Sequence, residues 1–241
     1  MSREVAKEVF INAPADVVWK ALTEARGLTQ WFSVDARVAP GVGGSVWVSW
    51  GEGAAGEAPI TGWEPARHFQ WTETRGPVKV AIDFHLEARD GGTVVRLVQS
   101  GFGDGPEWDD EFHMVEGGWS YFMAHLQWYL ERHRDVRRDL IGFRARVAMT
   151  REDAFARLVS LTDGLETTPV VYKVATCQAA FLIPSLNDAI LFIEIEPGAG
   201  MVRGGFWLST YGLGDTRFES VRAEFTAAYD AALGLGGGDT R

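Results

Sequence analysis

A strict alternation between Val78 and Glu87 constrains the fold more than any other feature of this chain. Every even position from 78 to 86 is apolar, and most of the odd positions carry polar side chains. Because successive residues of a strand point to opposite faces, the pattern predicts an antiparallel strand with one buried face. Asp90-Gly91-Gly92 then predicts a hairpin turn into a second strand, from Thr93 to Ser100.

The segments before this hairpin predict the rest of an antiparallel sheet. A first strand is expected from Glu4 to Asn12, followed by a helix that begins near Pro14 and is broken by Gly27. A short helical turn from Leu28 to Phe32 comes next. From Val34 to Phe102 the period is again two, with glycine-rich turns, which predicts a meander of about six strands.

A long amphipathic helix is predicted after the meander, from Trp108 to Arg132. Its apolar residues recur at intervals of three and four: Phe112, Val115, Trp119, Phe122, Met123, Leu126, Tyr129 and Leu130. Gly117-Gly118 interrupts the stripe and indicates a bend or a close approach to the sheet. One helix laid across a curved antiparallel sheet is an α+β arrangement, and it buries the apolar side of both.

After Leu140 the order of elements restarts. A strand is expected from Phe143 to Met149, then a helix to about Thr162 with Thr150 as its N-cap. Four further strands and a final helix from Asp215 follow: Val170 to Thr176, Ala179 to Ile183, Ile190 to Glu194 and Met201 to Thr210. This order predicts a shortened and diverged second copy of the first half, the alternative being a C-terminal extension of a single domain.

Composition narrows the class of protein and its partners. Of the 241 residues, 46% are hydrophobic, enough to form a substantial core. The formal net charge of −10 disfavours nucleic-acid binding. A single cysteine, Cys177, fits a reducing compartment. The charged segment Met1 to Lys7 does not resemble a signal peptide, and no stretch approaches the roughly 18 apolar residues of a membrane span. A cytoplasmic location is therefore expected.

Three segments together resemble the START/SRPBCC superfamily. Residues 9–23 and 28–32 are similar to its opening signature, in which an "I-x-A-P" strand end precedes a "V-W-x-A-L-T" helix and a "W-F" pair. Residues 62–71 are similar to its "E-x-x-P-x-R-L-x-x-x-W" strand pair, and Gly118-Trp119 matches a "G-W" of the long helix. Residues 4–132 are thus most similar to the bacterial activator-of-heat-shock-protein-ATPase-like (AHSA-type) family.

The resemblance implies a helix-grip fold, a curved antiparallel sheet wrapped around a long C-terminal helix with an apolar cavity between them. We expect residues 1–138 to form this domain, residues 139–235 a shortened and diverged helix-grip-like domain, and residues 236–241 a flexible tail. Members of the superfamily bind hydrophobic molecules, some are cyclases, and one branch stimulates a chaperone ATPase. The cavity-lining residues expected from the resemblance are Trp31, Phe32, Trp47, Trp71, Phe84, Phe102, Trp119, Phe122 and Met123.

The leading hypothesis is a binding protein for a small hydrophobic ligand, oriented by polar groups such as Gln99, Tyr121 or Arg96. The second half is expected to cap the cavity or to mediate pairing into a homodimer. Two alternatives stay open. A cyclase or hydrolase-type enzyme would use a cavity carboxylate or histidine whose pKa is shifted by burial. A module that binds a chaperone or regulator would carry a large exposed apolar patch.

Candidate chemistry outside the cavity is sparse in the sequence. Glu107, Asp109, Asp110 and Glu111 could supply a general base, or could complement the N-terminus of the long helix. The histidines, at 68, 85, 113, 125 and 133, form no H-x-x-x-H or H-E-x-x-H pair, and Asp83 and His85 fall on the polar face of their strand. The glycine-rich segments lack the strand–loop–helix context of a phosphate loop. The sequence therefore predicts no metal site and no cofactor.

Overall fold

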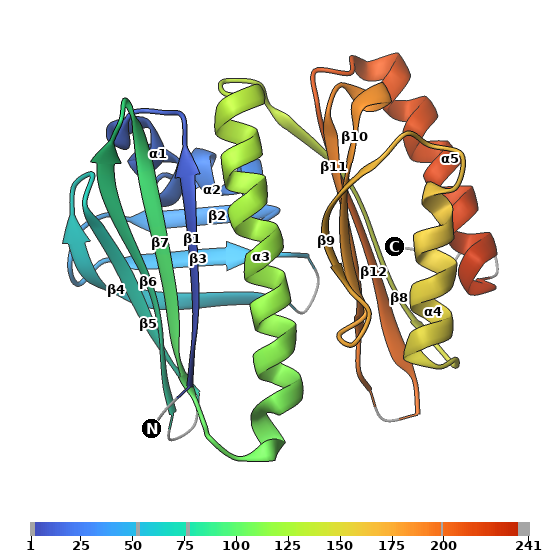
Figure 1. The fold of residues 1–241 in the computed structure, drawn as a ribbon, viewed down its shortest axis with the longest axis horizontal. Coiled ribbons are helices and arrows are strands. Elements are labelled where there is room, and N and C mark those ends of the chain that lie inside the picture. Colours follow the sequence, from blue (N-terminus) through green and yellow to red (C-terminus); the bar gives the residue numbers. More distant parts are fainter. Residues whose placement is uncertain (1–2, 52–53, 76–77, 199, 236–241) are drawn as a thin grey trace. The chain divides into compact units, whose positions relative to one another are not determined.

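A computed structural model describes residues 3–51, 54–75, 78–198 and 200–235 (Figure 1). The chain divides into two compact units, residues 1–135 and 136–241. The division falls a few residues before the expected one after residue 138. The expected tail at 236–241 lies outside the described residues.

The N-terminal unit contains one seven-stranded antiparallel sheet in the order β1-β7-β6-β5-β4-β3-β2. Its strands are β1 (Arg3–Ile11), β2 (Asp35–Ala39), β3 (Ser45–Ser49), β4 (Ala55–Glu64), β5 (His68–Arg75), β6 (Val78–Arg89) and β7 (Gly92–Phe102). The meander predicted after the opening helices is confirmed by β2 to β7. In β6, Val80, Ile82, Phe84 and Leu86 are buried as the alternation predicts.

Two short helices, α1 (Ala15–Thr23) and α2 (Ala25–Trp31), join β1 to β2. The prediction that Gly27 breaks the first helix is wrong, because the break falls at Glu24 and Gly27 lies inside α2. A Cβ at Gly27 would lie 2.4 Å from the Lys20 carbonyl oxygen. The glycine therefore allows α2 to approach the backbone of α1 closely.

The long helix α3 (Asp109–Arg132) follows a single 3-10 turn, η1 (Pro106–Trp108). It lies along the β1 side of the sheet (Figure 1). Lys7 Nζ forms an ion pair with Glu116 at 2.5 Å, and Gln127 Nε2 donates to the Phe10 carbonyl oxygen at 3.0 Å. The Trp119 ring lies over the buried face of the sheet, 5.9 Å from the Phe84 ring. The helix-grip arrangement predicted for this half is confirmed.

The C-terminal unit contains a five-stranded antiparallel sheet in the order β8-β12-β11-β10-β9. Its strands are β8 (Arg138–Val147), β9 (Thr168–Lys173), β10 (Gln178–Ile183), β11 (Ala189–Glu196) and β12 (Val202–Tyr211). The prediction that the first strand begins at Phe143 is wrong, since pairing with β12 extends β8 back to Arg138, which lies opposite Tyr211.

Two helices, α4 (Arg151–Val159) and α5 (Asp215–Leu233), pack on one face of this second sheet. A 3-10 turn, η2 (Ser160–Thr162), extends α4, and another, η3 (Pro184–Leu186), follows β10. The predicted N-cap is confirmed, because Thr150 Oγ1 accepts the Asp153 backbone N–H at 3.0 Å. Phe155 and Leu158 of α4 and Phe225 and Tyr229 of α5 belong to one core with the inward residues of β8, β10, β11 and β12.

None of the helices in the described part of the chain combines the length and apolar character that crossing a membrane requires.

Candidate functional site

A cavity of about 400 Å³ lies in the N-terminal unit between the sheet and α3. Strands β3 to β7 supply one wall, and α3 supplies the opposite wall. Its lining residues are Phe32, Val46, Val48, Trp50, Ala54, Ala55, Gly56, Glu57, Ala58, Trp71, Glu73, Ile82, Gln99, Val115, Gly118, Trp119 and Phe122. Most of these side chains are apolar, which is typical of a small-molecule pocket.

Aromatic rings form the continuous part of the wall. The Phe32 and Trp119 rings are stacked with centroids 5.5 Å apart and 8° between their planes. The Phe122 ring meets Phe32 edge to face at 4.8 Å and Trp119 at 5.8 Å. Phe32 directly follows α2, whereas Trp119 and Phe122 lie one turn apart on α3. The helix contributes one continuous aromatic surface because its residues at i and i+3 share a face.

Two tryptophan N–H groups are held by specific acceptors in the wall. Trp119 Nε1 donates to Gln99 Oε1 at 2.5 Å, and Trp50 Nε1 donates to the Phe32 carbonyl oxygen at 2.8 Å. An indole N–H can only donate, so Gln99 must present its amide oxygen to Trp119. The NH₂ group of Gln99 therefore takes no part in that bond. The Gln99 side chain borders the cavity.

The structure places Phe32, Trp71, Trp119 and Phe122, four of the residues expected to line the cavity, in its wall. Trp31, Phe84, Phe102 and Met123 are buried but lie outside the wall. Trp31 donates its ring N–H to the Ala21 carbonyl oxygen at 3.0 Å, and Phe102 packs against Phe112 at 5.3 Å.

Trp47 points away from the cavity. Val46 and Val48 of β3 face inward and line the wall, so the residue between them faces the other side of the sheet. There its ring packs under the Arg37 guanidinium at 4.1 Å.

Of the three polar residues expected to orient a ligand, one also borders the cavity and two do not. Gln99 borders the cavity, whereas Arg96 is exposed on the opposite face of β7. Tyr121 is buried beside Phe122 and His125, at 5.1 and 5.3 Å between ring centroids. The wall also contains Val115 and Gly118, which sequence reasoning missed. Their spacing from Trp119 and Phe122 on the helix is the signal that could have identified them.

The acidic cluster at residues 107–111 lies outside the cavity wall. Asp109 pairs with Arg3 at 2.6 Å, in the first turn of α3. This placement fits the alternative in which the carboxylates complement the N-terminus of the helix.

The groups with raised pKa values in the described part of the chain do not border this cavity. Burial raises the pKa of the Cys177 thiol, which disfavours a reactive thiolate. Burial, and then the neighbouring Glu196, raise the pKa of Glu194 in the C-terminal sheet to about 7.

Sequence comparison identifies the family. Residues 12–131 match the family model described as activator of Hsp90 ATPase homolog 1-like protein. The N-terminal unit of the chain belongs to this family. The matched region runs from the end of β1 to the last turn of α3, so the family's domain contains the cavity. A search of curated proteins gave no significant match.

Solved structures similar to the chain come from several sources. The Aha1 dimer of Colwellia psychrerythraea is 23% identical, with 54% of this chain and 96% of that one covered and a TM-score of 0.48. Protein MLL2253 of Mesorhizobium loti is 25% identical, with 55% and 99% covered and a TM-score of 0.49. DynU16, a putative protein in the dynemicin biosynthetic locus, is 20% identical, with 96% and 97% covered and a TM-score of 0.47.

Proposed function

We propose that the N-terminal, AHSA1-like unit is a binding protein for a small hydrophobic molecule, held between the sheet and α3. The observation that carries this proposal is the cavity of about 400 Å³ walled by Phe32, Trp71, Trp119 and Phe122. This volume lies within the roughly 300–1,000 Å³ of small-molecule pockets. Burial of apolar ligand surface, worth about 25 cal/mol per Å², would supply most of the affinity.

The polar part of the wall narrows the ligand class. The Trp119 indole fixes the orientation of the Gln99 amide, so the Gln99 NH₂ is presented as a donor. Glu73 and Glu57 border the same cavity, and Glu57 accepts a hydrogen bond from Ser45 Oγ at 2.7 Å. The best-matched ligand is a largely apolar, planar molecule that stacks on the aromatic wall and carries a carbonyl or ether oxygen for Gln99.

A cavity-filling substitution at Gly118 tests this proposal without removing a side chain from the wall. An added Cβ at Gly118 meets nothing within 4 Å, and the residue borders the cavity. Gly118→Leu therefore places a side chain in the ligand's volume, whereas Gly118→Ala is the matched control that leaves most of it open.

The measurement is quenching of tryptophan fluorescence by a panel of aromatic ketones and quinones, together with native mass spectrometry of the purified protein. We expect saturable quenching for the wild type and for Gly118→Ala, and a loss of affinity of at least tenfold for Gly118→Leu. Equal affinities in all three proteins, or no saturable binding in the wild type, would contradict the proposal.

The variant Gln99→Leu tests whether the amide group of Gln99, and not only the shape of its side chain, contributes to ligand affinity. It keeps most of the apolar contact but removes the amide donor. Ligands that carry an oxygen acceptor should lose about tenfold in affinity, consistent with one lost hydrogen bond, while pure hydrocarbons of the same shape should not. The same loss for both ligand types would indicate that Gln99 acts through Trp119 rather than through the ligand.

We also propose that the C-terminal unit is a shortened, diverged second copy of the helix-grip domain. In both units the first strand pairs with the last one before the terminal helix, and the other strands follow in reverse chain order. Expression of residues 136–235 alone tests whether this unit is a domain. A cooperative unfolding transition is expected, and a fragment without one would contradict the proposal. A role in pairing between two chains stays a prediction.

A further inference from the structure

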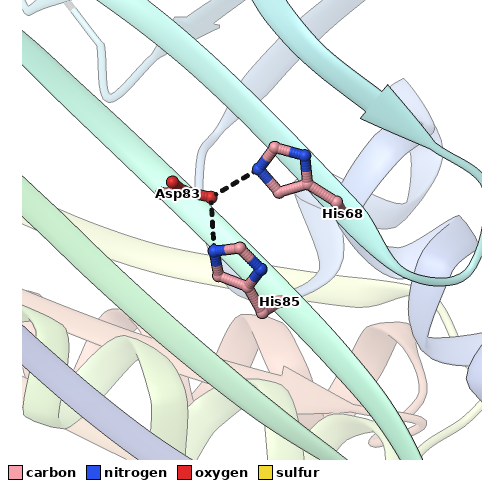
Figure 2. A group of neighbouring side chains, drawn as sticks. All are labelled: His68, Asp83 and His85. Carbon is pink, nitrogen blue, oxygen red and sulfur yellow. Dashed lines mark hydrogen bonds and ion pairs between the residues drawn. The ribbon is translucent and has the colours of Figure 1, made fainter.

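Two histidines from consecutive strands meet on the outer face of the N-terminal sheet. His68 of β5 lies directly opposite His85 of β6, and Gln70 lies opposite Asp83 in the same antiparallel pair. Residues at i and i+2 of a strand share a face, so Asp83 stands beside both rings. Figure 2 shows the three side chains directed toward one another. They lie on the opposite face from Trp71 and Ile82, which line the cavity.

The atoms that converge are those that bind metal ions. Asp83 Oδ1 lies 2.7 Å from His68 Nε2 and 3.1 Å from His85 Nε2. One potential ligand atom from each of the three residues lies within 4.8 Å of the others. Metal–nitrogen and metal–oxygen bonds of about 2.0–2.2 Å place tetrahedral ligand atoms roughly 3.3 Å apart. Small side-chain rotations would therefore open the cluster around one ion.

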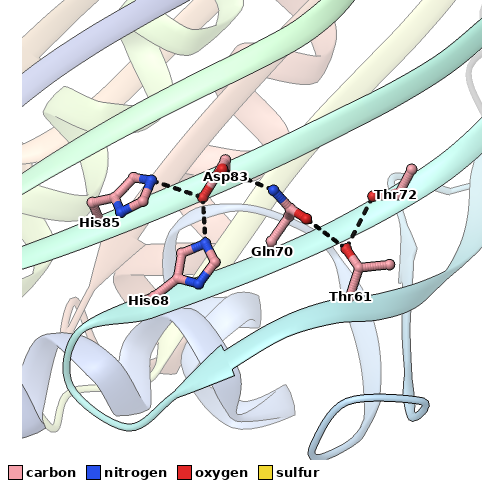
Figure 3. A network of polar contacts seen from close by, with 6 residues as sticks. All are labelled: Thr61, His68, Gln70, Thr72, Asp83 and His85. Atoms are coloured by element: carbon pink, nitrogen blue, oxygen red, sulfur yellow. Dashed lines mark hydrogen bonds and ion pairs between the residues drawn. The ribbon is translucent and has the colours of Figure 1, made fainter.

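The carboxylate is held by a second group of side chains, as metal ligands usually are. Gln70 Nε2 donates to Asp83 Oδ2 at 2.8 Å, so Oδ1 faces the histidines. Thr61 Oγ1 donates to Gln70 Oε1 at 2.8 Å, and lies 3.0 Å from Thr72 Oγ1. This chain of contacts crosses β4, β5 and β6 (Figure 3). It fixes which oxygen of Asp83 is presented.

Space for the first imidazole is provided by a glycine on the neighbouring strand. A Cβ at Gly62 of β4 would lie 2.5 Å from His68 Cε1 and 3.0 Å from His68 Nδ1. Any larger residue at position 62 would therefore displace the ring. The stacked arrangement of the two imidazoles, with centroids 4.7 Å apart, depends on this gap.

The cluster is open to solvent on one side. The His68 and Asp83 side chains are 23% and 22% exposed, and that of His85 is 54% exposed. An ion can therefore enter from solution, and water can complete its coordination.

We infer that His68, Asp83 and His85 form a binding site for a first-row divalent metal ion. Two imidazole nitrogens and one carboxylate oxygen are a ligand set suited to Zn²⁺ and its neighbours rather than to Ca²⁺ or Mg²⁺, which prefer oxygen ligands. The ion links β5 to β6 and replaces the direct contacts between Asp83 Oδ1 and the Nε2 atoms of the two rings. The ion-free cluster is the competing arrangement, in which Asp83 Oδ1 stays in direct contact with the Nε2 atoms of both imidazoles.

Isothermal titration of the full-length, EDTA-treated protein with Zn²⁺ tests the inference. One equivalent should bind to the wild type. His68→Gln, His85→Gln and Asp83→Asn should each weaken binding by at least about 100-fold, and Gln70→Ala by about tenfold through the lost orientation of Asp83. His113→Gln, which removes an imidazole from α3, is the matched control and should leave the isotherm unchanged.

A second readout distinguishes coordination from adsorption to the surface. Co²⁺ bound by this ligand set should give visible d–d absorption that Zn²⁺ abolishes, and this absorption should be missing in His85→Gln. Because the His85 side chain is more than half exposed, this variant should keep the wild-type circular dichroism spectrum. Absence of stoichiometric Zn²⁺ binding in the wild type, or binding that the His68 and His85 variants retain, would overturn the inference in favour of the ion-free cluster.

Discussion

In both units the first strand pairs with the last strand and a helix follows that last strand, but the space under this terminal helix is filled differently. In the N-terminal unit, Trp119 of α3 contacts the sheet at Phe84 and Gln99, and a cavity of about 400 Å³ lies beside this contact. In the C-terminal unit, Phe225 and Tyr229 of α5 reach the sheet directly, with ring centroids 5.3 and 6.3 Å from that of Phe206. Tyr229 Oη also donates to the Gly204 carbonyl oxygen at 2.6 Å.

The difference lies in how the helices and their side chains fill the space over the apolar face of each sheet. Gly118 of α3 leaves open space where the helix faces its sheet, whereas in the second unit α4 and α5 cover the apolar face together. A surface pocket of about 380 Å³ does occur in the second unit, but its wall comes from α4, β9 and the segment up to Cys177, not from α5. A shared order of strands and helices therefore does not by itself create a ligand cavity.

The largest expected contrast comes from removing one aromatic ring from each unit. Phe206→Ala should lower the free energy of unfolding by about 4 kcal/mol, because its fully buried ring leaves a cavity in a closed core. Phe122→Ala should cost less than half of that, because its ring already borders open space. Urea unfolding followed by circular dichroism measures both losses. Nine of the ten tryptophans precede residue 136, so their fluorescence reports the N-terminal unit. Equal losses of unfolding free energy in the two variants would contradict the conclusion that the two units are packed differently.

Replacing one glycine by leucine in each unit should destabilise the C-terminal unit much more than the N-terminal unit. An added Cβ at Gly204 of β12 already lies 3.3 Å from methyl groups of Leu158 and Leu233, so Gly204→Leu should destabilise the unit by about 3 kcal/mol. Gly118→Leu enters the cavity and should change the free energy of unfolding by less than about 1 kcal/mol. Thermal unfolding of the two variants checks this difference, and a large loss for Gly118→Leu would show that the N-terminal space is not available.

A third contrast between the units concerns one carboxyl group in each, on the strand that comes second to last in chain order. Asp83 of β6 is bonded to two histidines and Gln70, whereas Glu194 of β11 lies beside Glu196 and has its pKa raised to about 7. A carboxyl group whose folded-state pKa exceeds its ordinary value of 4.5 stabilises the fold below pH 4.5, and that contribution is lost as the pH rises through 7.

Glu194→Gln should therefore be more stable than the wild type at pH 8, by up to about 3 kcal/mol, and the advantage should disappear only below about pH 4.5. The measurement is the free energy of unfolding in urea across this pH range. Parallel curves for the two proteins would mean that Glu194 ionises in the folded protein as it does in the unfolded chain.

The smallest expected effect is a gain from Gly118→Ala. Alanine favours a helix by about 1 kcal/mol over glycine, and the added methyl group meets open space. The melting temperature should rise by a few degrees without loss of ligand binding. A decrease would indicate that α3 uses the freedom of this glycine.

Much of the fold could be predicted because its signals are local. The alternation in β6, the apolar stripe of α3 and the Thr150 cap each depend on residues close in sequence, and each element formed where it was expected. The failures have non-local causes. Gly27 lies inside α2 because of its contact with α1, and β8 begins at Arg138 because β12 pairs with it.

The same distinction between local and non-local signals applies to the residues of the candidate sites. Periodicity placed Trp119 and Phe122 on the inward side of α3, whereas the family resemblance suggested Trp47, whose strand position turns it outward. The histidine cluster was missed because motif spacing detects ligands on one helix, whereas His68 and His85 are joined by the register between two strands.

By itself, the sequence determined the order of strands and helices, the family, and which face of each element is apolar, because these follow from backbone periodicity and short motifs. Tertiary structure decided which side chains line the cavity of the first unit, a cavity that the family resemblance had only led us to expect. It also decided that one histidine from each of two neighbouring strands lies beside the same carboxylate. Both outcomes depend on the packing of side chains and on the register between strands, and no short segment of the sequence specifies either.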